Sequence, residues 1–150
     1  MPRLLTLLTI AGLSLSTWAS AATPSCSQLA QQFARSHQLN AQELNEIFTS
    51  LALAQSLPPK FVNKREAQAA GWQPGRSLWD VLPGKSIGGD RFGNREQRLP
   101  SGRYQEADLD YRGQKRNAKR LVYQGNGPRF ITIDHYQTFT EVPACQATPR

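Results

Sequence analysis

The order of two sequence patterns most restricts the fold of this chain, because helical spacing comes first and strand-like runs come afterwards. Between residues 26 and 55, apolar residues recur at the spacing of amphipathic helices: Leu29, Phe33, Leu44, Ile47, Phe48, Leu51 and Leu53. Asn40 followed by Glu43 is a capping-box pattern for the second of two helices. Pro58 and Pro59 end this region, because neither ring tolerates a helix interior.

A short third helix has signals at both of its ends. Asn63 and Glu66 form a second capping pattern, and Gly71 is a stop signal. Lys64 lies in the first turn, where the helix macrodipole favours anions over cations. Such a cation indicates either a solvated surface pair with Arg65 or a functional role.

After Gly71 the chain consists of short β-like runs separated by Gly, Pro and Asn. The expected strands are residues 86–90, 103–109, 119–124, 130–133 and 138–142, with turns at 99–102 and 125–128. Helices followed by strands favour an α+β fold. We therefore expect N-terminal helices packed on a C-terminal antiparallel sheet of about five strands.

The first 21 residues have the pattern of a signal peptide. Arg3 precedes an apolar run over residues 4–15, which is too short to span a bilayer as a stable helix. Ala19 and Ala21 are the small residues that a signal peptidase reads, so we expect cleavage after Ala21. The sequence therefore predicts export to the periplasm or the cell exterior, with no membrane attachment.

Cys26 and Cys145 are the only two cysteines. An exported protein meets oxidising conditions, in which such a pair usually closes. Neither cysteine has nearby ligands of the zinc-site type or a His neighbour that would make it a nucleophile. The sequence therefore predicts a structural disulfide.

The charge of the chain favours a polyanionic partner. Its 18 Lys and Arg residues against 11 Asp and Glu residues give a formal net charge of +7 at pH 7. Nucleic acid and an anionic surface both fit this excess, and many exported bacterial proteins are basic without binding nucleic acid. The length suits one domain.

Imidazole chemistry depends on two histidines. His37 lies in a polar link between the two helices and is expected to be solvated, whereas His135 follows a predicted strand. Glu106 is in the middle of another strand, and Arg116 and Arg120 precede a third. A base, an acid and cations are what metal-free RNA cleavage requires. The two arginines could equally be the wet face of a basic turn.

Two long runs carry a resemblance to a known family: Pro-Gly-Lys-Ser-Ile-Gly-Gly-Asp at residues 83–90 and Asp-His-Tyr-Gln-Thr-Phe-Thr at residues 134–140. Over residues 57–142 the chain resembles the barnase-like bacterial guanyl-preferring ribonucleases. Lys64, Glu106, Arg116 and Arg120 fall in the family's order between and around these runs.

The resemblance implies a secreted endoribonuclease that cleaves single-stranded RNA after guanosine through a 2′,3′-cyclic phosphate. Glu106 would be the general base and His135 the general acid, without a metal or another cofactor. Lys64, Arg116 and Arg120 would hold the scissile phosphate, which would explain the cation at the helix start. Asp108 would order the two arginines.

The resemblance also implies a guanine-binding loop, formed by Phe92, Gly93, Asn94, Arg95 and Glu96. Main-chain N–H groups would face the O6 and N7 side of the base, and Glu96 would accept from its N1 and N2 edge. Tyr136 would lie close to the base or the phosphate. Gly93 departs from the small hydroxyl residue usual in the family.

These expectations divide the chain into a signal peptide (1–21), an N-terminal helical segment comprising an extension and the first helix (22–56), a barnase-like core (57–142) and a tail with Cys145 (143–150). RNA is the expected partner of a monomer, together with a small acidic inhibitor protein of the barstar type. Two alternatives remain: a basic, catalytically silent nucleic-acid-binding module, and the same chemistry used as an antibacterial toxin.

Overall fold

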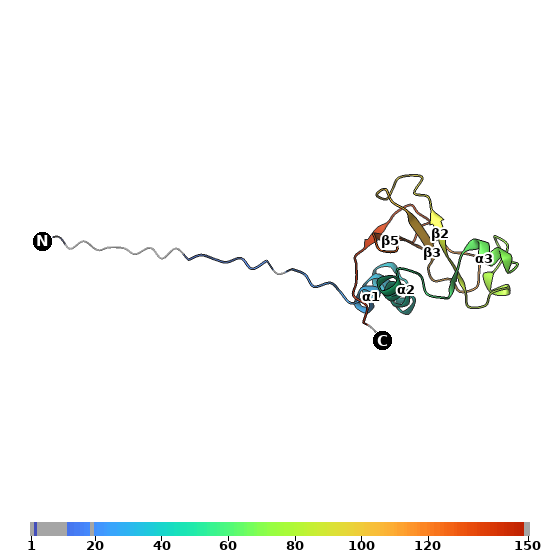
Figure 1. The fold of residues 1–150 in the computed structure, drawn as a ribbon, viewed down its shortest axis with the longest axis horizontal. Coiled ribbons are helices and arrows are strands. Elements are labelled where there is room, and N and C mark those ends of the chain that lie inside the picture. The colour runs from blue at the N-terminus through green and yellow to red at the C-terminus, as the bar shows by residue number, and fades with distance from the viewer. Residues whose placement is uncertain (1, 3–11, 19, 149–150) are drawn as a thin grey trace.

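A computed structural model describes residues 2, 12–18 and 20–148. Arg3 and most of the apolar run of the expected signal peptide lie outside the described residues. The described residues before Ser25 contain no helix or strand, and Figure 1 shows the blue N-terminal trace leading away from the domain. None of the described helices is both long and apolar enough to cross a membrane.

The described residues form three α-helices, α1 (Cys26–His37), α2 (Ala41–Ala54) and α3 (Lys64–Ala69), and the last two begin at the predicted caps. The side chains of Asn40 and Asn63 accept hydrogen bonds from the N–H groups of Glu43 and Glu66, each at 2.8 Å. A short 3₁₀ helix, η1 (Leu78–Asp80), follows α3. All three predicted helices are therefore confirmed.

The expected capping box of α2 is only half formed. The Glu43 side chain does not accept a hydrogen bond from the Asn40 N–H. Its carboxylate accepts instead from the Asp110 N–H at 2.8 Å and pairs with Lys60 Nζ at 2.6 Å. The Asn40 N–H donates instead to Asp110 Oδ1 at 3.0 Å. The start of α2 is thus capped by residues far away in the sequence.

In the part of the chain that the structure describes, six strands form one sheet in sequential order: β1 (Phe61–Val62), β2 (Ser86–Phe92), β3 (Tyr104–Asp108), β4 (Arg120–Tyr123), β5 (Arg129–Thr132) and β6 (Thr140–Val142). β2 to β6 pair antiparallel, which confirms the α+β fold. The additional strand β1 pairs parallel with β2, since α3 carries the chain back to the same end of the sheet. Two residues are too short to show an alternating pattern.

The helices cover one face of the sheet. Leu29, Phe33, Ile47 and Phe48 of α1 and α2 share a core with sheet residues Ala107, Leu109, Leu121, Tyr123, Ile131 and Val142. Figure 1 shows α1 and α2 side by side on one side of the strands, and α3 beyond β2. Because side chains alternate along a strand, the residues between these core positions point to the opposite face.

The opposite face has an aromatic half and a charged half. Leu99, Tyr104, Val122 and Phe130 form a second buried cluster there. Glu106, Asp108, Arg120 and Thr132 continue the same face, since Asp108 pairs with Arg120 and Arg120 with Thr132 across the strands. The charged candidates from the sequence therefore gather on the face that α1 and α2 leave uncovered.

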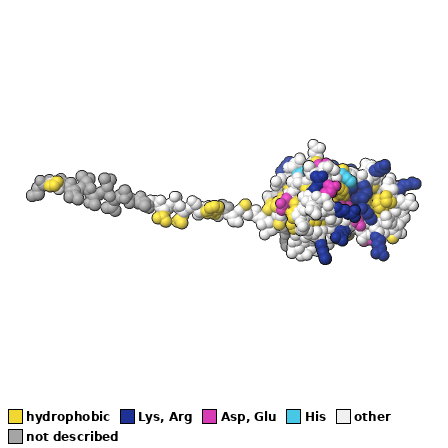
Figure 2. Space-filling view, turned by 90° about the horizontal axis from the view of Figure 1, so that it is seen from above, with side chains coloured by type: hydrophobic (Ala, Val, Ile, Leu, Met, Phe, Trp, Pro, Cys, Tyr) yellow, Lys and Arg dark blue, Asp and Glu magenta, His cyan; other side chains and the backbone are white. Residues whose placement is uncertain are grey.

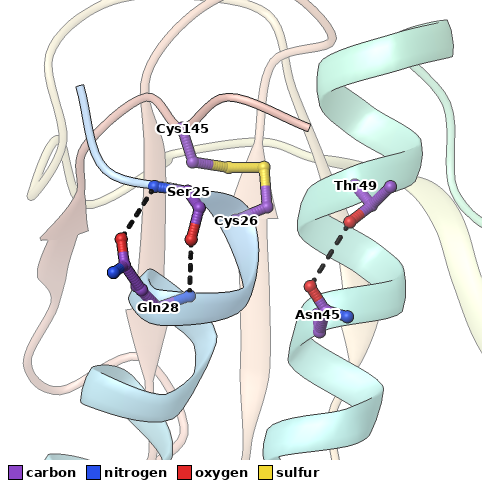
Figure 3. Close-up of a disulfide and its surroundings, with 6 residues drawn as sticks. All are labelled: Ser25, Cys26, Gln28, Asn45, Thr49 and Cys145. Atoms are coloured by element: carbon purple, nitrogen blue, oxygen red, sulfur yellow. Dashed lines mark hydrogen bonds between the residues drawn. A yellow bond between two sulfur atoms is a disulfide. The ribbon is translucent and has the colours of Figure 1, made fainter. Parts of the chain in front are cut away.

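A disulfide joins Cys26 to Cys145, with their Cα atoms 4.9 Å apart and 119 positions apart in sequence. The predicted bridge is confirmed. Ser25 caps α1 by a complete capping box with Gln28, as Figure 3 shows. The Cys26 N–H also donates to the Gln146 carbonyl at 3.0 Å, and the Gln146 N–H to the Pro24 carbonyl at 2.9 Å. The tail is thereby fixed to the start of α1.

Candidate active site

A β-bulge in β2 decides which side chains reach the charged face. Gly88 pairs with Ala107 on the helix-covered face, where a Cβ would come within 2.6 Å of the Phe61 ring. Asp90, two residues on, would normally share that face. The extra residue Gly89, with φ of +99°, shifts the register so that Asp90 pairs with Glu106 instead. The bulge thus brings Asp90 to the charged face.

Glu106 lies half-buried at the centre of this face. It is flanked by Asp90 on β2 and Val122 on β4. The hydroxyl of Tyr136 donates a hydrogen bond to Glu106 Oε2 at 2.8 Å. Burial, followed by the negative charge of Glu106, raises the pKa of Tyr136 to about 12. Tyr136 therefore remains a neutral hydrogen-bond donor at any physiological pH.

Two arginines are held beside Glu106 by one buried carboxylate. Arg116 Nε and Nη2 each donate to Asp108 at 2.7 Å, and Arg120 Nε lies 3.0 Å from Asp108 Oδ1. The hydrogen bond to Asp108 raises the pKa of Arg116, and Glu106 raises it further. The expected pairing of Asp108 with both arginines is therefore present. Since the side chain of Arg120 is only 3% exposed, its position is fixed.

His135 lies in a tight loop after β5, organised by Asp134. The Asp134 carboxylate accepts from the hydroxyls of Thr132 (2.9 Å) and Thr138 (2.6 Å) and from the N–H groups of Gln137 and Thr138. These bonds, led by those from Thr138, lower the pKa of Asp134 to about 2. A carboxylate with this many donors stays charged and holds the loop in one conformation.

The Asp134 loop stabilises an unusual backbone. His135 and Tyr136 have φ of 54° and 70°, a left-handed conformation that costs a non-glycine residue about 1–3 kcal/mol. The Tyr136 N–H donates to Thr132 Oγ1 at 3.0 Å, and the His135 N–H to the Ala118 carbonyl at 3.0 Å. The rings of His135 and Tyr136 meet edge to face, 4.7 Å between centroids. His135 is exposed, and its neighbour Tyr136 contacts Glu106.

The start of α3 is bonded to the same face. The Lys64 N–H donates to Asp90 Oδ2 at 3.0 Å, and Asp90 is the cross-strand neighbour of Glu106. The negative charge of Asp90 thus compensates the positive end of the short helix. This contact places Lys64 beside the charged face, as its unusual position in the sequence suggested.

A pocket of about 290 Å³ lies next to Glu106. Every predicted base-binding residue lines it: Phe92, Gly93, Asn94, Arg95, Glu96 and Tyr136. The remaining lining residues are Arg91, Arg98, Glu106 and Phe139. The rings of Phe92 and Tyr136 stack at 5.3 Å with 25° between their planes. The Asn94 side chain fixes the loop by accepting from the Leu99 N–H and donating to its carbonyl.

Glu96 is the predicted base-reading side chain with a protein partner already in place. Its Oε2 accepts from Arg98 Nε at 2.7 Å, and Arg98 Nη1 donates to the Gln137 carbonyl at 2.9 Å. The Glu96 side chain is 73% exposed, so this ion pair is solvated and weak. A ligand in the pocket could therefore compete with Arg98 for the carboxylate.

Several contacts were not predicted from the sequence. The bond from Tyr136 to Glu106, the Thr132 and Asp134 network and the position of Asp90 all depend on how strands pair. His37 was expected to be solvated but is half-buried, stacked on Phe33 at 5.4 Å with its Nε2 3.2 Å from Thr140 Oγ1. This prediction was wrong because β6 packs beside the end of α1. In the described part of the chain, no three His, Cys, Asp or Glu residues are grouped to hold a metal.

Figure 2 shows many Lys and Arg side chains on the face of the domain in view, with few carboxylates among them. The Glu106 carboxylate, the fixed guanidinium groups of Arg116 and Arg120 and the exposed His135 imidazole on the adjoining loop are groups that can transfer protons or bind an anion. This is the chemistry available to the site.

Comparisons with known proteins agree with this arrangement. A family model described as ribonuclease matches residues 49–143. Proteins named ribonuclease from Bacillus intermedius and Bacillus pumilus are each 50% identical over 90 residues, covering 57% of this chain and 56% of theirs. One from Heyndrickxia coagulans is 49% identical over 90 residues, covering 83% of its length. The chain thus spans about half the length of the two Bacillus relatives.

Proposed function

The chain belongs to the ribonuclease family, and on this premise we propose that it is an endoribonuclease that cleaves single-stranded RNA after guanosine. The observation that carries the proposal is the placement of Glu106 and His135 around one residue. Tyr136 hydrogen-bonds to Glu106 and packs against His135 at the edge of the pocket. Glu106 and Tyr136 line the pocket and His135 adjoins Tyr136, which supports the proposed roles of Glu106 as base and His135 as acid.

The proposed reaction is a transphosphorylation. Glu106 accepts the proton of the ribose 2′-hydroxyl, and the resulting 2′-oxygen attacks the adjacent phosphorus. His135 gives a proton to the departing 5′-oxygen, so that the bond to the next nucleotide breaks and a 2′,3′-cyclic phosphate is formed. A later hydrolysis of this product, with the two proton roles reversed, yields a 3′-phosphate.

The cations stabilise the charge that develops on the phosphate. Arg116 and Arg120 are positioned by Asp108 before any substrate arrives, so little reorganisation is required during the reaction. Lys64 at the start of α3 is the proposed third cation, since its backbone N–H bonds to Asp90, the cross-strand neighbour of Glu106. A silent nucleic-acid-binding module would need these cations but would have no use for the paired base and acid.

Base selection is assigned to the loop around the 290 Å³ pocket. Main-chain N–H groups of the 92–96 loop would face O6 and N7, and Glu96 would accept from N1 and N2 of guanine. Adenine lacks this pair of donors, so the loop would discriminate between the two purines.

We also propose export, with residues 1–21 as the signal peptide. The disulfide between Cys26 and Cys145 supports this, since such bridges persist in oxidising compartments. RNA is the proposed partner of a monomeric enzyme, and a small acidic inhibitor protein is proposed to protect the producing cell.

The test uses the purified chain and oligoribonucleotides that contain a single guanosine, incubated in the presence of a metal chelator. Cleavage on the 3′ side of guanosine with a 2′,3′-cyclic phosphate end is the expected result. Binding without cleavage would support the silent module. Cleavage only after metal addition, or at every base equally, would contradict the mechanism or the base preference.

A further inference from the structure

The bulge at Gly89 has an effect on the residue after Asp90. Because Asp90 points to the charged face, Arg91 points to the opposite face, where it pairs with Gln105 across the strands. Arg103 precedes Gln105 by two residues, so it lies diagonally across from Arg91 on the same face. Two arginines are thereby brought together next to the base pocket.

These residues line a second pocket of about 540 Å³, together with Gly89, Tyr104 and Gln105. No acidic residue lines it. Arg91 and Arg103 are both exposed, and in the described part of the chain neither forms an ion pair with a carboxylate. Two uncompensated guanidinium groups that line one pocket favour the binding of an anion there.

The two pockets adjoin at Arg91 of β2. Arg91 lines both the pocket of about 290 Å³ and the pocket of about 540 Å³. β1 pairs only with Ser86 and Ile87, so no described strand covers residues 89–92 on the side away from β3. An extended chain can therefore run from the base pocket over this open edge to the two arginines.

The chemistry of the second pocket favours a phosphate. Arginine binds phosphate in a bidentate geometry. The Gln105 amide bridges to the Gly89 carbonyl at 3.0 Å, and Gly89 has nothing within 4 Å of its missing side chain. The floor is thus polar and open to close approach. Tyr104, the one apolar residue of the lining, is buried at 1% exposure and offers no anchor for a protein partner.

We propose that Arg91 and Arg103 form an additional phosphate-binding site for a nucleotide outside the one held in the base pocket, extending the RNA-binding surface around the β2 edge. The inference rests on the proposed ribonuclease function. It assigns the two arginines to substrate length rather than to chemistry, because Arg103 lines the second pocket and is absent from the lining of the pocket that contains Glu106.

The experiment compares kcat/KM on a guanosine-containing dinucleotide with kcat/KM on octanucleotides that extend either 5′ or 3′ of the same guanosine. Arg103→Ala should leave the dinucleotide rate unchanged and lower the rate on one of the octanucleotides by about 3- to 10-fold at low salt. The slope of the logarithm of the octanucleotide binding constant against the logarithm of the salt concentration should become shallower by about one unit. The double variant Arg91→Ala/Arg103→Ala should lower the ratio of kcat/KM on the octanucleotide to kcat/KM on the dinucleotide further.

Arg35→Ala is the matched control, because Arg35 is an exposed arginine in the last turn of α1 and makes the same change in net charge. Arg35→Ala should leave the ratio of kcat/KM on the octanucleotides to kcat/KM on the dinucleotide unchanged. The proposal is overturned if the ratio of kcat/KM on the octanucleotides to kcat/KM on the dinucleotide is the same in wild type and Arg103→Ala. If, in that case, Arg103→Ala weakens binding of a polyglutamate probe, the surface is assigned to an acidic protein instead.

A failure of the proposed function can be distinguished from a failure of this site. If no substrate is cleaved, the ribonuclease assignment is refuted, and binding of the intact octanucleotides still decides the role of the arginines. Weaker octanucleotide binding by Arg103→Ala than by Arg35→Ala supports the site, and equal binding overturns it.

Discussion

The hydroxyl of Tyr136 donates a hydrogen bond to Glu106 Oε2 at 2.8 Å, joining the loop after β5 to the centre of β3. A residue expected to lie near the base or the phosphate thus also contacts the proposed general base. A hydrogen bond accepted by a carboxylate also fixes its orientation, so Glu106 is held in place before a ribose binds.

Tyr136→Phe should therefore lower cleavage while the fold is kept. The hydroxyl holds one oxygen of the Glu106 carboxylate at 2.8 Å, so without it the carboxylate is no longer fixed where it would take the ribose proton. The measurement is kcat/KM on a guanosine dinucleotide, which should fall by about 10-fold, the size of a lost hydrogen bond to a charged group. Tyr104→Phe, which removes a bond to the Pro100 carbonyl instead, is the control and should keep the wild-type rate. Equal rates for wild type and Tyr136→Phe would contradict this role.

Glu106→Ala and His135→Ala should each lower RNA cleavage by about 10²-fold or more, the usual contribution of a general base or acid. Both side chains have access to solvent, so the fold should survive, which circular dichroism can check. His37→Ala removes the other histidine and should keep cleavage within a few-fold of wild type. Near-normal turnover by folded His135→Ala would refute the mechanism.

Asp134→Asn should weaken the loop that carries His135 in a pH-dependent way. The pKa of Asp134 is about 2 in the folded protein, below the value of about 3.9 for an unfolded chain. Its charge therefore adds stability that is complete above pH 4 or so and is lost as the pH falls towards 2. The difference between the urea midpoints of wild type and Asp134→Asn should shrink over that interval. If the difference between the two urea midpoints stays constant from pH 6 to about 2, the charge of Asp134 does not contribute to the stability of the folded protein.

Much of the local structure could be predicted from the sequence. The N-caps at Asn40 and Asn63 and the disulfide were correct, because caps depend on residues close in sequence and two cysteines allow one pairing. The site residues were predicted through the resemblance. The residues alone left open whether Arg116 and Arg120 are solvated or belong to a catalytic set.

The contacts that were missed depend on strand register and packing. The bulge at Gly89 reverses the faces of Asp90 and Arg91, and no local pattern distinguishes it from an ordinary strand. Glu43 has the spacing of a capping box, yet it bonds to Asp110 because β3 ends beside α2. The position of His37 likewise depends on the packing of β6.

The double variant Cys26→Ala/Cys145→Ala tests what the disulfide contributes. In the chain-entropy model, a bridge across 119 positions stabilises the folded state by about 5 kcal/mol, and by less if the bridge is strained. Urea unfolding should show a loss of this order, while cleavage of a dinucleotide at low temperature should remain near normal, since the bridge lies at the helix-covered side. A strong loss of activity in the folded variant would show that the bridge also shapes the site.

Glu96→Ala should separate base reading from chemistry. A lost bidentate contact costs about 1–3 kcal/mol of discrimination, so the guanosine-to-adenosine rate ratio should fall by about 5- to 150-fold on two dinucleotides differing only in the 5′ base. Arg98→Ala is the matched control: it frees Glu96 from its 2.7 Å ion pair and should keep or increase the ratio. An unchanged ratio in Glu96→Ala would mean that its only role is the pair with Arg98.

The bond between Cys26 and Cys145 turns most of the chain into a covalent ring, with the Ser25 and Gln146 backbones paired beside the closure. A mechanical pull on the two ends of such a ring passes through the sulfur atoms and bypasses the sheet. Even when unfolded, the oxidised chain cannot be threaded through a narrow pore as a single strand. Once the bridge has closed, a translocation channel or a protease chamber must admit two strands side by side or wait for a reductant.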